Sequence, residues 1–497
     1  MLKLTIRRKD MSYVIAADCG TTGTRAMLYD LERNKFVSGG TLPIKQIYPH
    51  SGWVEEDANE IYADTLAVIV GQIGAAPRPE DIACIGITNQ SETVIAWDRR
   101  TGKPIYNAIV WQCRRTAEYC EGLKEYAEKI KSKTGLVVDP YFSATKMRWI
   151  LDNVPEAQAL MKEGNLCMGT VDSYLIFRLT EGKSFVTDHT NASRTMLFNI
   201  RTLKWDEELL ELFGIPESVL PEVKSCTSVM GKFEYGGRYI PIAGVAGDQQ
   251  AALVGQACLS EGKGKITYGT GVFMLLCTGD VPAESSCGMI TTVGCSFGDK
   301  VLYALEGSVF NAGSAVQWLR DGLNFFNSSA ESEDFALKVP DNGGVYFVPA
   351  FTGLGAPYWN SEARATFVGI SRGSNKYHLT RAVLESIAYS VKDLAVNMCE
   401  DSGICIREIG CDGGASANNF LMQFQADVLG AELVRPVEKE STALGAAYLS
   451  AIALGYYTED DVIKLRSAER AFKPSADRKK FDELYAEYKK AVEKCLF

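Results

Sequence analysis

Histidine is scarce in this chain, which has only His50, His189 and His378 among its 497 residues, and none of the three lies near another in sequence. Serine–histidine–aspartate triads, cysteine–histidine pairs and histidine-ligated metal centres all need an imidazole beside a partner group. The shortage disfavours these mechanisms. A general base, if the chain uses one, is therefore expected to be a carboxylate.

Other absences narrow the class of protein. No G-x-x-x-x-G-K-[ST] or G-x-G-x-x-G motif follows an expected strand, so P-loop and Rossmann nucleotide sites are excluded. The 14 cysteines contain no C-x-x-C pair, which argues against zinc ribbons and indicates a reducing compartment. The net charge of -10 argues against a nucleic-acid partner, and no apolar run is long enough to cross a membrane. We expect a cytoplasmic protein without membrane insertion.

The length of the chain predicts more than one domain, because a single hydrophobic core stops growing at roughly 250–300 residues. The first residues are basic but lack the apolar core of a secretory signal. We interpret residues 1–10 as an N-terminal tail or tag, with Met11 as the candidate native start.

Residues 18–25 are small, hydroxylated or charged and separate two apolar runs, 13–17 and 26–29. This pattern predicts a hairpin with a tight polar turn. Glycine lets the backbone approach a ligand, and clustered N–H groups bind anions. Asp18 can hold a divalent metal and Arg25 can neutralise phosphate. An ordinary hairpin is the alternative interpretation of this stretch.

A second turn of the same design lies about half a chain further on. Gly269, Thr270 and Gly271 separate the strand-like runs 265–268 and 272–276. Two such hairpins indicate two similar domains that face each other across a cleft. The glycine- and serine-containing stretch 255–262 breaks the pattern, so we predict an N-terminal domain over 11–257 and a C-terminal domain over 258–497.

Two strand-to-helix junctions add further polar groups. Asp248 follows the strand-like run 241–246 and opens a helix, where it serves either as a helix cap or as a functional carboxylate. Residues 412–419 follow the strand-like run 409–411 and open a helix that reaches about residue 428. Glycines at this turn leave room for an adenine or ribose, which Asn418 can hydrogen-bond; an ordinary helix N-terminus is the alternative.

These elements, in this order and spacing, resemble the FGGY kinases, the sugar-kinase branch of the actin/Hsp70/hexokinase ATPase superfamily. The resemblance extends over nearly the whole chain and, within the family, is to the glycerol kinases. It rests on six runs: YNAIVWQCRRT (106–116), DPYFS (139–143), NASRTMLFN (191–199), GDQQAAL (247–253), FTGLGAPYW (351–359) and DGGA (412–415).

The resemblance implies an α/β fold with two ribonuclease-H-like domains around a central cleft. Each domain is expected to hold a five-stranded mixed sheet with helices on both faces. The implied activity is ATP-dependent phosphorylation of a primary hydroxyl of glycerol, with Mg²⁺ as cofactor. The resemblance also implies a homodimer or homotetramer and a small polyol as substrate.

Site residues follow from the resemblance position by position. Asp248 is the implied general base, and Asp18 and Asp248 are the implied metal ligands. The implied polyol contacts are Ser91, Glu92, Trp111, Tyr141, Asp248, Gln249 and Phe273. The implied nucleotide and phosphate contacts are Thr21, Thr22, Gly23, Arg25, Gly269, Thr270, Gly271, Gly313, Gln317, Gly414, Ala415 and Asn418.

One substrate position departs from the family pattern. Glycerol kinases carry arginine in the motif Asn-Gln-Arg-Glu-Thr, whereas this chain has Ser91 within residues 89–93. Losing a hydrogen bond from a charged donor costs about 1.5–3 kcal/mol. One interpretation is a glycerol kinase with altered glycerol binding. A second is a kinase for a longer polyol or ketose. An actin- or Hsp70-like ATPase switch and a catalytically silent regulatory relative are the alternatives from other classes.

Overall fold

The computed structural model describes residues 12–475 and 477–496, so the predicted tail at 1–10 lies outside the described residues. The chain forms two compact units. Unit 1 contains the residues up to Leu259 together with Thr292–Tyr303 and Glu440–Leu465, and unit 2 contains Ser260–Thr291, Ala304–Lys439 and the residues from Arg466 onward. The break after Leu259 falls within the predicted stretch 255–262. The division into two continuous domains stays a prediction, and the units differ from it in the two segments that return to unit 1.

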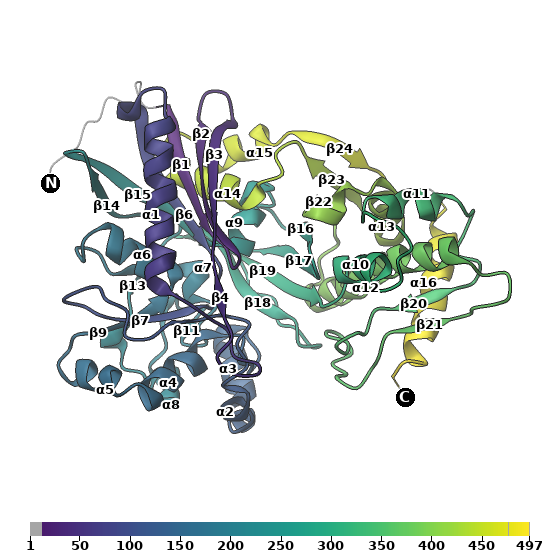
Figure 1. The fold of residues 1–497 in the computed structure, drawn as a ribbon, viewed down its shortest axis with the longest axis horizontal. Coiled ribbons are helices and arrows are strands. Elements are labelled where there is room, and N and C mark those ends of the chain that lie inside the picture. The colour runs from purple at the N-terminus through teal and green to yellow at the C-terminus, as the bar shows by residue number, and fades with distance from the viewer. Residues whose placement is uncertain (1–11, 476, 497) are drawn as a thin grey trace. The chain divides into compact units, whose positions relative to one another are not determined.

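The largest sheet of unit 1 has six strands (Figure 1). Their order is β14 (Val229–Tyr235), β15 (Arg238–Gly247), β6 (Ile82–Asn89), β1 (Tyr13–Cys19), β2 (Gly23–Asp30) and β3 (Lys35–Pro43). β1 forms the predicted antiparallel hairpin with β2, while β1, β6 and β15 run parallel to one another. The parallel strands therefore end at one edge of the sheet.

Helices cover both faces of this sheet, and the strands present apolar side chains to one set of helices and glycines to the other. Ile15, Ala17 and Leu28 join a core with α1 (Ala58–Ala75) and α6 (Val171–Leu179), which lie beside the sheet in Figure 1. Gly86 and Gly244 face α14 (Ser441–Ala453), and a Cβ at either position would lie within 2.3 Å of an atom of its Ser450. These two glycines let α14 pack directly on the strands. α14 also packs against α9 (Asp248–Gly255).

A second sheet of unit 1 has five short strands. Its order is β4 (Gln46–Ile47), β5 (Glu55–Glu56), β8 (Ala108–Ile109), β7 (Val94–Asp98) and β9 (Leu166–Thr170). The remaining helices of unit 1 are α2 (Ala117–Glu121), α3 (Ala127–Thr134), α4 (Ser143–Asn153), α5 (Pro155–Lys162), α7 (His189–Ala192), α8 (Glu207–Phe213) and α15 (Glu459–Leu465). Two-stranded sheets pair β10 (Val186–Asp188) with β13 (Glu222–Lys224) and β11 (Phe198–Asn199) with β12 (Lys204–Trp205).

The main sheet of unit 2 has seven strands, although the segment Thr292–Tyr303, which covers parts of its first two strands, is grouped with unit 1. Their order is β18 (Ile290–Phe297), β19 (Lys300–Val309), β17 (Val272–Gly279), β16 (Lys263–Tyr268), β22 (Glu408–Asp412), β23 (Glu432–Pro436) and β24 (Ala468–Phe472). β16 forms the predicted antiparallel hairpin with β17 and runs parallel to β22. A separate pair joins β20 (Tyr346–Val348) to β21 (Thr366–Val368).

One large hydrophobic core holds unit 2 together. It combines residues of the main sheet with apolar residues of its helices. The helices are α10 (Gly313–Asp321), α11 (Glu331–Leu337), α12 (Lys376–Ser402), α13 (Asn419–Leu429) and α16 (Arg478–Glu493). α12 is the longest described helix and packs against α10, α11, α13 and α16, so it is the scaffold of the unit.

The two main sheets share a five-strand order. β3-β2-β1-β6-β15 in unit 1 matches β19-β17-β16-β22-β23 in unit 2, and each begins with a hairpin followed by parallel strands. The expected count of five strands is wrong for the complete sheets. β14 extends the first sheet as the hairpin partner of β15, and β18 and β24 extend the second by pairing along edges that would otherwise be exposed.

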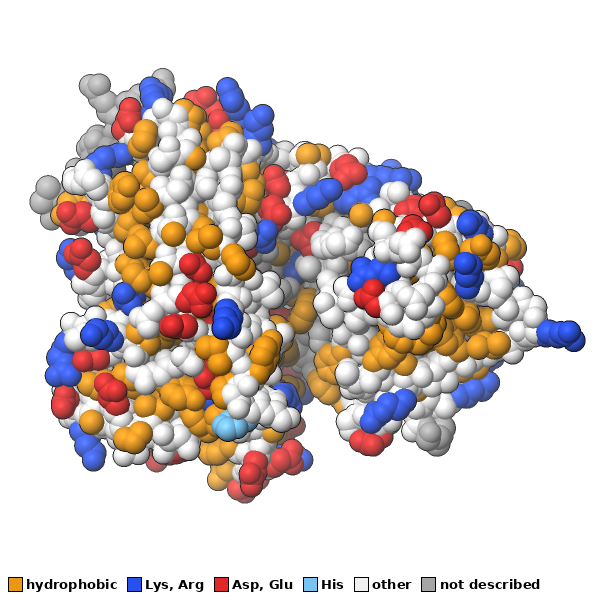
Figure 2. All heavy atoms as spheres, in the orientation of Figure 1, with side chains coloured by type: hydrophobic (Ala, Val, Ile, Leu, Met, Phe, Trp, Pro, Cys, Tyr) orange, Lys and Arg blue, Asp and Glu red, His pale blue; other side chains and the backbone are white. Residues whose placement is uncertain are grey.

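Charged side chains of both signs are present on the described surface. On the face shown in Figure 2, Lys and Arg side chains are interspersed with Asp and Glu and form no broad basic area among the coloured residues. No helix among the described residues is long and apolar enough to span a bilayer. All 14 cysteines are free thiols, and most of them are buried. They therefore contribute to the core as small apolar side chains.

Candidate active site

The parallel strands of unit 1 bring three predicted site segments to one sheet edge. Asp18 of β1 pairs in register with Thr88 of β6, and Asn89 of β6 pairs with Gly247 of β15. The segment after β6 and the start of α9 therefore lie beside the β1–β2 turn. Ligand sites of open α/β sheets form at this edge, beyond the carboxyl ends of parallel strands.

The β1–β2 turn is closed by its own backbone and contacts a predicted substrate residue. The Gly20 N–H donates to the Gly23 carbonyl at 3.1 Å. Trp111 Nε1 donates to Thr21 Oγ1 at 2.9 Å, which joins the predicted phosphate turn to the predicted polyol wall. Thr22 is exposed at the tip of the turn. Its hydroxyl is therefore accessible to a ligand.

Asp18 and Arg25 form an ion pair at the base of this turn. Arg25 Nε lies 2.8 Å from Asp18 Oδ2, and the same guanidinium contacts Glu440. Burial raises the pKa of Asp18 to about 6, Arg25 opposes that shift, and the negative charges of Asp248 and Glu440 add to it. Burial lowers the pKa of Arg25, but the two carboxylates outweigh it and raise the value overall. Two carboxylates thus pair with one arginine, and the charge of a third, Asp248, acts on Asp18.

Asp248 opens α9 but does not cap it, since Gly247 occupies the N-cap position. Asp248 Oδ1 accepts from the Gln249 N–H at 2.9 Å and lies 3.5 Å from Ser91 Oγ. Gln249 Nε2 lies 3.3 Å from Asp248 Oδ2. The structure therefore brings Ser91, Asp248 and Gln249 together and orients the carboxylate within the predicted acceptor site.

Glu92, Tyr141 and Trp111 form a second cluster through an arginine that the sequence reasoning did not assign. Arg194 Nε lies 2.6 Å from Glu92 Oε1, and its Nη2 lies 3.5 Å from Tyr141 Oη. The Tyr141 and Trp111 rings meet edge to face at 5.5 Å. Both charged side chains are buried. Arg194 lies inside the run 191–199, on which the family resemblance partly rests. It is the one charged residue of that run, and this feature could have marked it as a candidate site residue.

A buried hydrogen-bond network fixes the segments that carry Asp248 and Glu92. Asp188 accepts from Thr190 Oγ1 at 2.6 Å and from Asn191 Nδ2 at 2.7 Å. Thr190 Oγ1 in turn accepts from the Gly247 N–H at 2.9 Å, and Asn191 pairs with Asn89. Asp188 therefore connects the end of β6 to the start of α9 through two side chains of α7.

Glu56 is a buried carboxyl group whose ionisation is expected to make the free energy of unfolding depend on pH. It is fully buried, and its Oε2 accepts from Gln90 Nε2 at 2.6 Å. Burial raises its pKa from the ordinary 4.5 to about 7. A raised acid pKa contributes stability that is complete below the unfolded-state pKa and is lost as pH rises through the folded-state value. The shift corresponds to about 3 kcal/mol.

We therefore expect Glu56→Gln to be more stable than the parent chain by up to about 3 kcal/mol at pH 8, with a much smaller difference at pH 4.5. The glutamine retains a carbonyl oxygen for the Gln90 contact. Urea unfolding at both pH values measures the difference. Glu80→Gln, at an exposed position, is the matched control. If the difference in free energy of unfolding between the parent and Glu56→Gln were the same at both pH values, the raised pKa of Glu56 would be contradicted.

In unit 2, the second predicted phosphate turn lies directly on the N-terminus of α10. The Ala312 and Ser314 N–H groups donate to the Thr270 carbonyl, and the Gly313 N–H donates to the Gly269 carbonyl at 3.1 Å. A Cβ on Gly313 would lie 2.4 Å from the Gly269 carbonyl oxygen. A Cβ on Gly271 would lie 2.4 Å from the Val309 carbonyl oxygen. Glycine is therefore required at both positions for this close approach.

The predicted adenosine turn meets the same strand end. Gly413 has a φ of 84°, and a Cβ there would lie 2.5 Å from the Tyr268 carbonyl oxygen. The helix expected to open within 412–419 begins only at Asn419, after a short 3-10 turn at Gly414–Ala417. Asn418 caps it by accepting from the Leu421 N–H at 2.9 Å, so the ordinary-cap alternative describes its side-chain oxygen. Its amide nitrogen lies 3.4 Å from Ser332 Oγ.

Four further predicted residues of unit 2 are exposed or lie close to exposed positions. Gln317 is exposed on α10, Gly414 is exposed in the 3-10 turn, and Ala415 is half-buried beside it. Phe273 is half-buried on β17, next to the phosphate turn. The accessible groups therefore surround the strand ends at 268–271 and 412–418.

Gly313→Ala should raise the KM for the nucleotide by about tenfold, because the added methyl group must push the 269–271 turn away from α10. Overpacking of this kind costs about 1–3 kcal/mol. Initial rates at varied nucleotide concentration measure it. Gly74→Ala is the control, since a Cβ there meets nothing within 4 Å. An unchanged nucleotide KM in Gly313→Ala would show that the turn does not bind phosphate.

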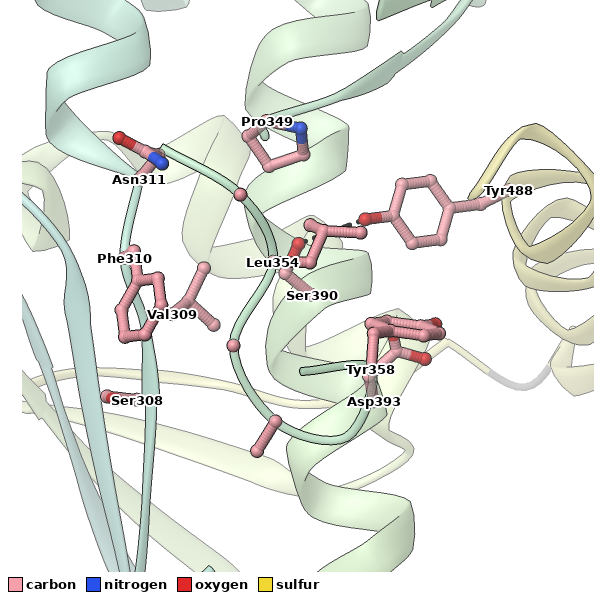
Figure 3. Close-up of a pocket in the computed structure, with 13 residues that line it drawn as sticks. Ser308, Val309, Phe310, Asn311, Pro349, Leu354, Tyr358, Ser390, Asp393 and Tyr488 are labelled. Atoms are coloured by element: carbon pink, nitrogen blue, oxygen red, sulfur yellow. Dashed lines mark hydrogen bonds between the residues drawn. The ribbon is translucent and has the colours of Figure 1, made fainter. Parts of the chain in front are cut away.

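A separate pocket in unit 2 is too small for a nucleotide. Figure 3 shows it between the segment 349–358, α12 and α16, with Ser390 hydrogen-bonded to Tyr488 at 3.0 Å. Its volume of about 20 Å³ holds roughly one water molecule. Tyr358 Oη donates to the buried Asp393 at 2.7 Å and anchors the segment to α12. The pocket is therefore a packing feature of the unit.

Two family models match the chain. Residues 13–255 match the N-terminal domain of the FGGY family of carbohydrate kinases, and residues 264–454 match the C-terminal domain of that family. Among curated proteins, the chain is 51% identical over 491 residues to the glycerol kinase of Halothermothrix orenii, covering 97% of this chain and 98% of that protein. It is 52% identical over 492 residues to glycerol kinase 2 of Thermotoga maritima, covering 98% and 99%.

Solved structures agree with these matches. The Plasmodium falciparum glycerol kinase structure with ADP superposes with a TM-score of 0.94 at 39% identity, covering 98% of this chain and 99% of that chain. A ligand-bound xylulose kinase of Lactobacillus acidophilus gives a TM-score of 0.86 at 26% identity, covering 97% and 99%. Together with the two α/β units and their matching strand order, these results show that the chain is a kinase and belongs to the FGGY family of carbohydrate kinases.

Proposed function

We propose that this chain transfers the γ-phosphoryl group of ATP to a primary hydroxyl of glycerol and forms glycerol 3-phosphate. The observation that carries the proposal is the position of Asp248, a carboxylate at the parallel-strand edge beside Ser91 and within the field of Asp18. Full-length relatives at 51–52% identity are named glycerol kinases, which supports glycerol as the acceptor.

Asp248 is the proposed general base. A primary alcohol is a weak nucleophile, and a carboxylate within hydrogen-bond reach accepts its proton as it attacks phosphorus. The Gln249 N–H donates to Asp248 Oδ1 and orients the carboxylate. The Ser91 hydroxyl lies within hydrogen-bond distance of the same oxygen. Glu92, with Arg194 and Tyr141, supplies polar groups for the other hydroxyls, while Trp111 gives an apolar wall to the carbon chain.

Charge neutralisation on the phosphates is assigned to Arg25 and to the backbone N–H groups of the two turns. Phosphoryl transfer depends mainly on positioning and on such electrostatic stabilisation. Asp18 and Asp248 are the proposed Mg²⁺ ligands; Mg²⁺ prefers oxygen donors and is bound in kinases by one or two carboxylates together with substrate phosphates. The excess of carboxylates over cations around Asp18 fits that role. Bound Mg²⁺ would supply positive charge to the phosphates.

A longer polyol or ketose is the second candidate acceptor, and Ser91 is the observation that favours it. Serine is shorter than the family arginine, so it leaves volume that an additional carbon can occupy. However, Ser91 is only 5% exposed, and its Oγ lies 2.3 Å from the position that a Cβ on Gly247 would take. The serine is therefore packed against the start of α9, which favours the smaller acceptor.

A substrate panel tests the acceptor. We expect kcat/KM to be highest for glycerol among three- to five-carbon polyols and ketoses, measured with ATP and Mg²⁺. Ser91→Arg should improve glycerol use, because a hydrogen bond from a charged donor contributes about 1.5–3 kcal/mol. A higher kcat/KM for a four- or five-carbon acceptor would contradict the proposal. The homodimer or homotetramer and the cytoplasmic location stay predictions, the first measurable by light scattering.

A further inference from the structure

Lys146 of α4 is a buried cation that the proposed chemistry does not use. Its side chain is fully buried, and its Nζ donates to three consecutive backbone carbonyls. The distances are 2.9 Å to Pro140, 2.6 Å to Tyr141 and 2.8 Å to Phe142. An ammonium group has three N–H donors, so these carbonyls use all of them. Lys146 forms no salt bridge with a carboxylate among the described residues.

The three carbonyls belong to the segment that presents Tyr141 to the acceptor site. The Tyr141 ring contacts Trp111, and its hydroxyl lies near Arg194, the ion-pair partner of Glu92. Asp139, just before the segment, accepts from the Tyr141 N–H at 2.8 Å. The Tyr141 backbone is therefore held from both sides, by Asp139 on its N–H and by Lys146 on its carbonyl.

We propose that Lys146 is a positioning residue for the acceptor site, where its ammonium group holds Tyr141 in the conformation that binds the polyol. This inference rests on the proposed function, since it assigns the control of acceptor affinity to a residue that does not touch the acceptor. Loss of the ammonium group removes a charged donor from three carbonyls at once. The segment 140–142 then loses its anchor, and acceptor binding weakens.

The charge of Lys146 makes this control sensitive to pH. Burial lowers its pKa to about 7, and the carboxylates of Glu92 and Asp139 oppose that shift, while Cys113 and Cys120 are the other titratable side chains near it. Burial raises the pKa of the Cys120 thiol to about 12, so this group stays protonated over the pH range of interest. The neutral amine has two N–H donors and a lone pair, so one carbonyl loses its donor when the proton leaves. Acceptor affinity should therefore fall as pH rises through 7.

Lys146→Met tests the proposal, because methionine has similar length and no donor. At pH 6 we expect the KM for glycerol to rise about tenfold, with kcat and the KM for ATP within about threefold of the parent. At pH 8.5 the glycerol KM of the variant should exceed that of the parent by only about threefold, because Lys146 of the parent has then lost its positive charge. Lys162→Met, at an exposed position of α5, is the matched control and should change neither constant. An unchanged glycerol KM at pH 6, or the same ratio at both pH values, would overturn the proposal.

Hydrogen exchange keeps the proposal testable if Lys146→Met does not fold or if glycerol is not the acceptor. In the parent chain, amides of residues 139–145 should exchange faster at pH 8.5 than at pH 6 after correction for intrinsic rates. Amides of α1 should show no such excess. Equal protection at both pH values would overturn the role of Lys146. A failure to phosphorylate glycerol combined with the expected exchange would instead overturn the proposed function alone.

Discussion

Replacing Asp248 with asparagine is expected to lower kcat by about a thousandfold and to leave the protein folded. General-base catalysis contributes about 10²–10⁴ to the rate, and an amide cannot accept the proton of the attacking hydroxyl. Asparagine keeps an oxygen for the Gln249 N–H, which donates to Oδ1 at 2.9 Å in the parent. The loss should therefore fall on kcat, with thermal stability close to that of the parent.

Steady-state rates with ATP and glycerol measure this effect, and circular dichroism with thermal unfolding confirms the fold. Asp57→Asn is the matched control. Asp57 caps α1 by accepting from the Asn59 N–H at 2.8 Å, and asparagine caps helices equally well. A kcat for Asp248→Asn within tenfold of the parent would remove Asp248 as the base.

Arg194→Met should destabilise the protein by about 3–5 kcal/mol, because it removes the arginine that offsets the buried charge of Glu92. The two side chains meet at 2.6 Å, with 2% and 3% of their surfaces exposed. Attraction inside the protein offsets the cost of burying each charge, so removing one leaves the other uncompensated. The KM for glycerol should also rise, since Glu92 is a proposed polyol contact.

Urea unfolding of three variants tests this explanation. The double variant Glu92→Gln/Arg194→Met should recover part of the lost stability, because it removes the buried negative charge along with the arginine. Lys183→Met breaks the exposed pair with Glu181 and should show no measurable change. A loss below about 1 kcal/mol in Arg194→Met, or a double variant less stable than the single one, would contradict it.

Local patterns were sufficient to predict the elements that carry the site. The two hairpins are strongly signalled, because apolar runs flank short turns of glycine and threonine. Asp248 could be placed at a strand-to-helix junction because it directly follows an apolar strand-like run, and the structure confirms that junction. The family resemblance implied the α/β class, which the comparisons and the two main sheets confirm.

Contacts between distant segments were beyond the reach of sequence patterns. Arg194 meets Glu92 across 102 residues, and Thr190 meets Gly247 across 57. The return of Glu440–Leu465 to unit 1 depends on the packing of α14 against α9 and the first sheet, which local periodicity does not encode. The added edge strands depend likewise on pairing geometry. For Asn418 the sequence left two roles open, a nucleotide contact and a helix cap. The structure shows that its side-chain oxygen caps α13.

The fate of the γ-phosphoryl group is the most direct test of the whole account. ATP labelled with ¹⁸O on the γ-phosphoryl oxygens is incubated with Mg²⁺, glycerol and the protein, and the products are analysed by mass spectrometry. The account predicts glycerol 3-phosphate that carries the label, formed in proportion to the ADP released. Label found only in inorganic phosphate would indicate an ATPase, and no turnover at all would indicate a catalytically silent relative. Either result would contradict the account.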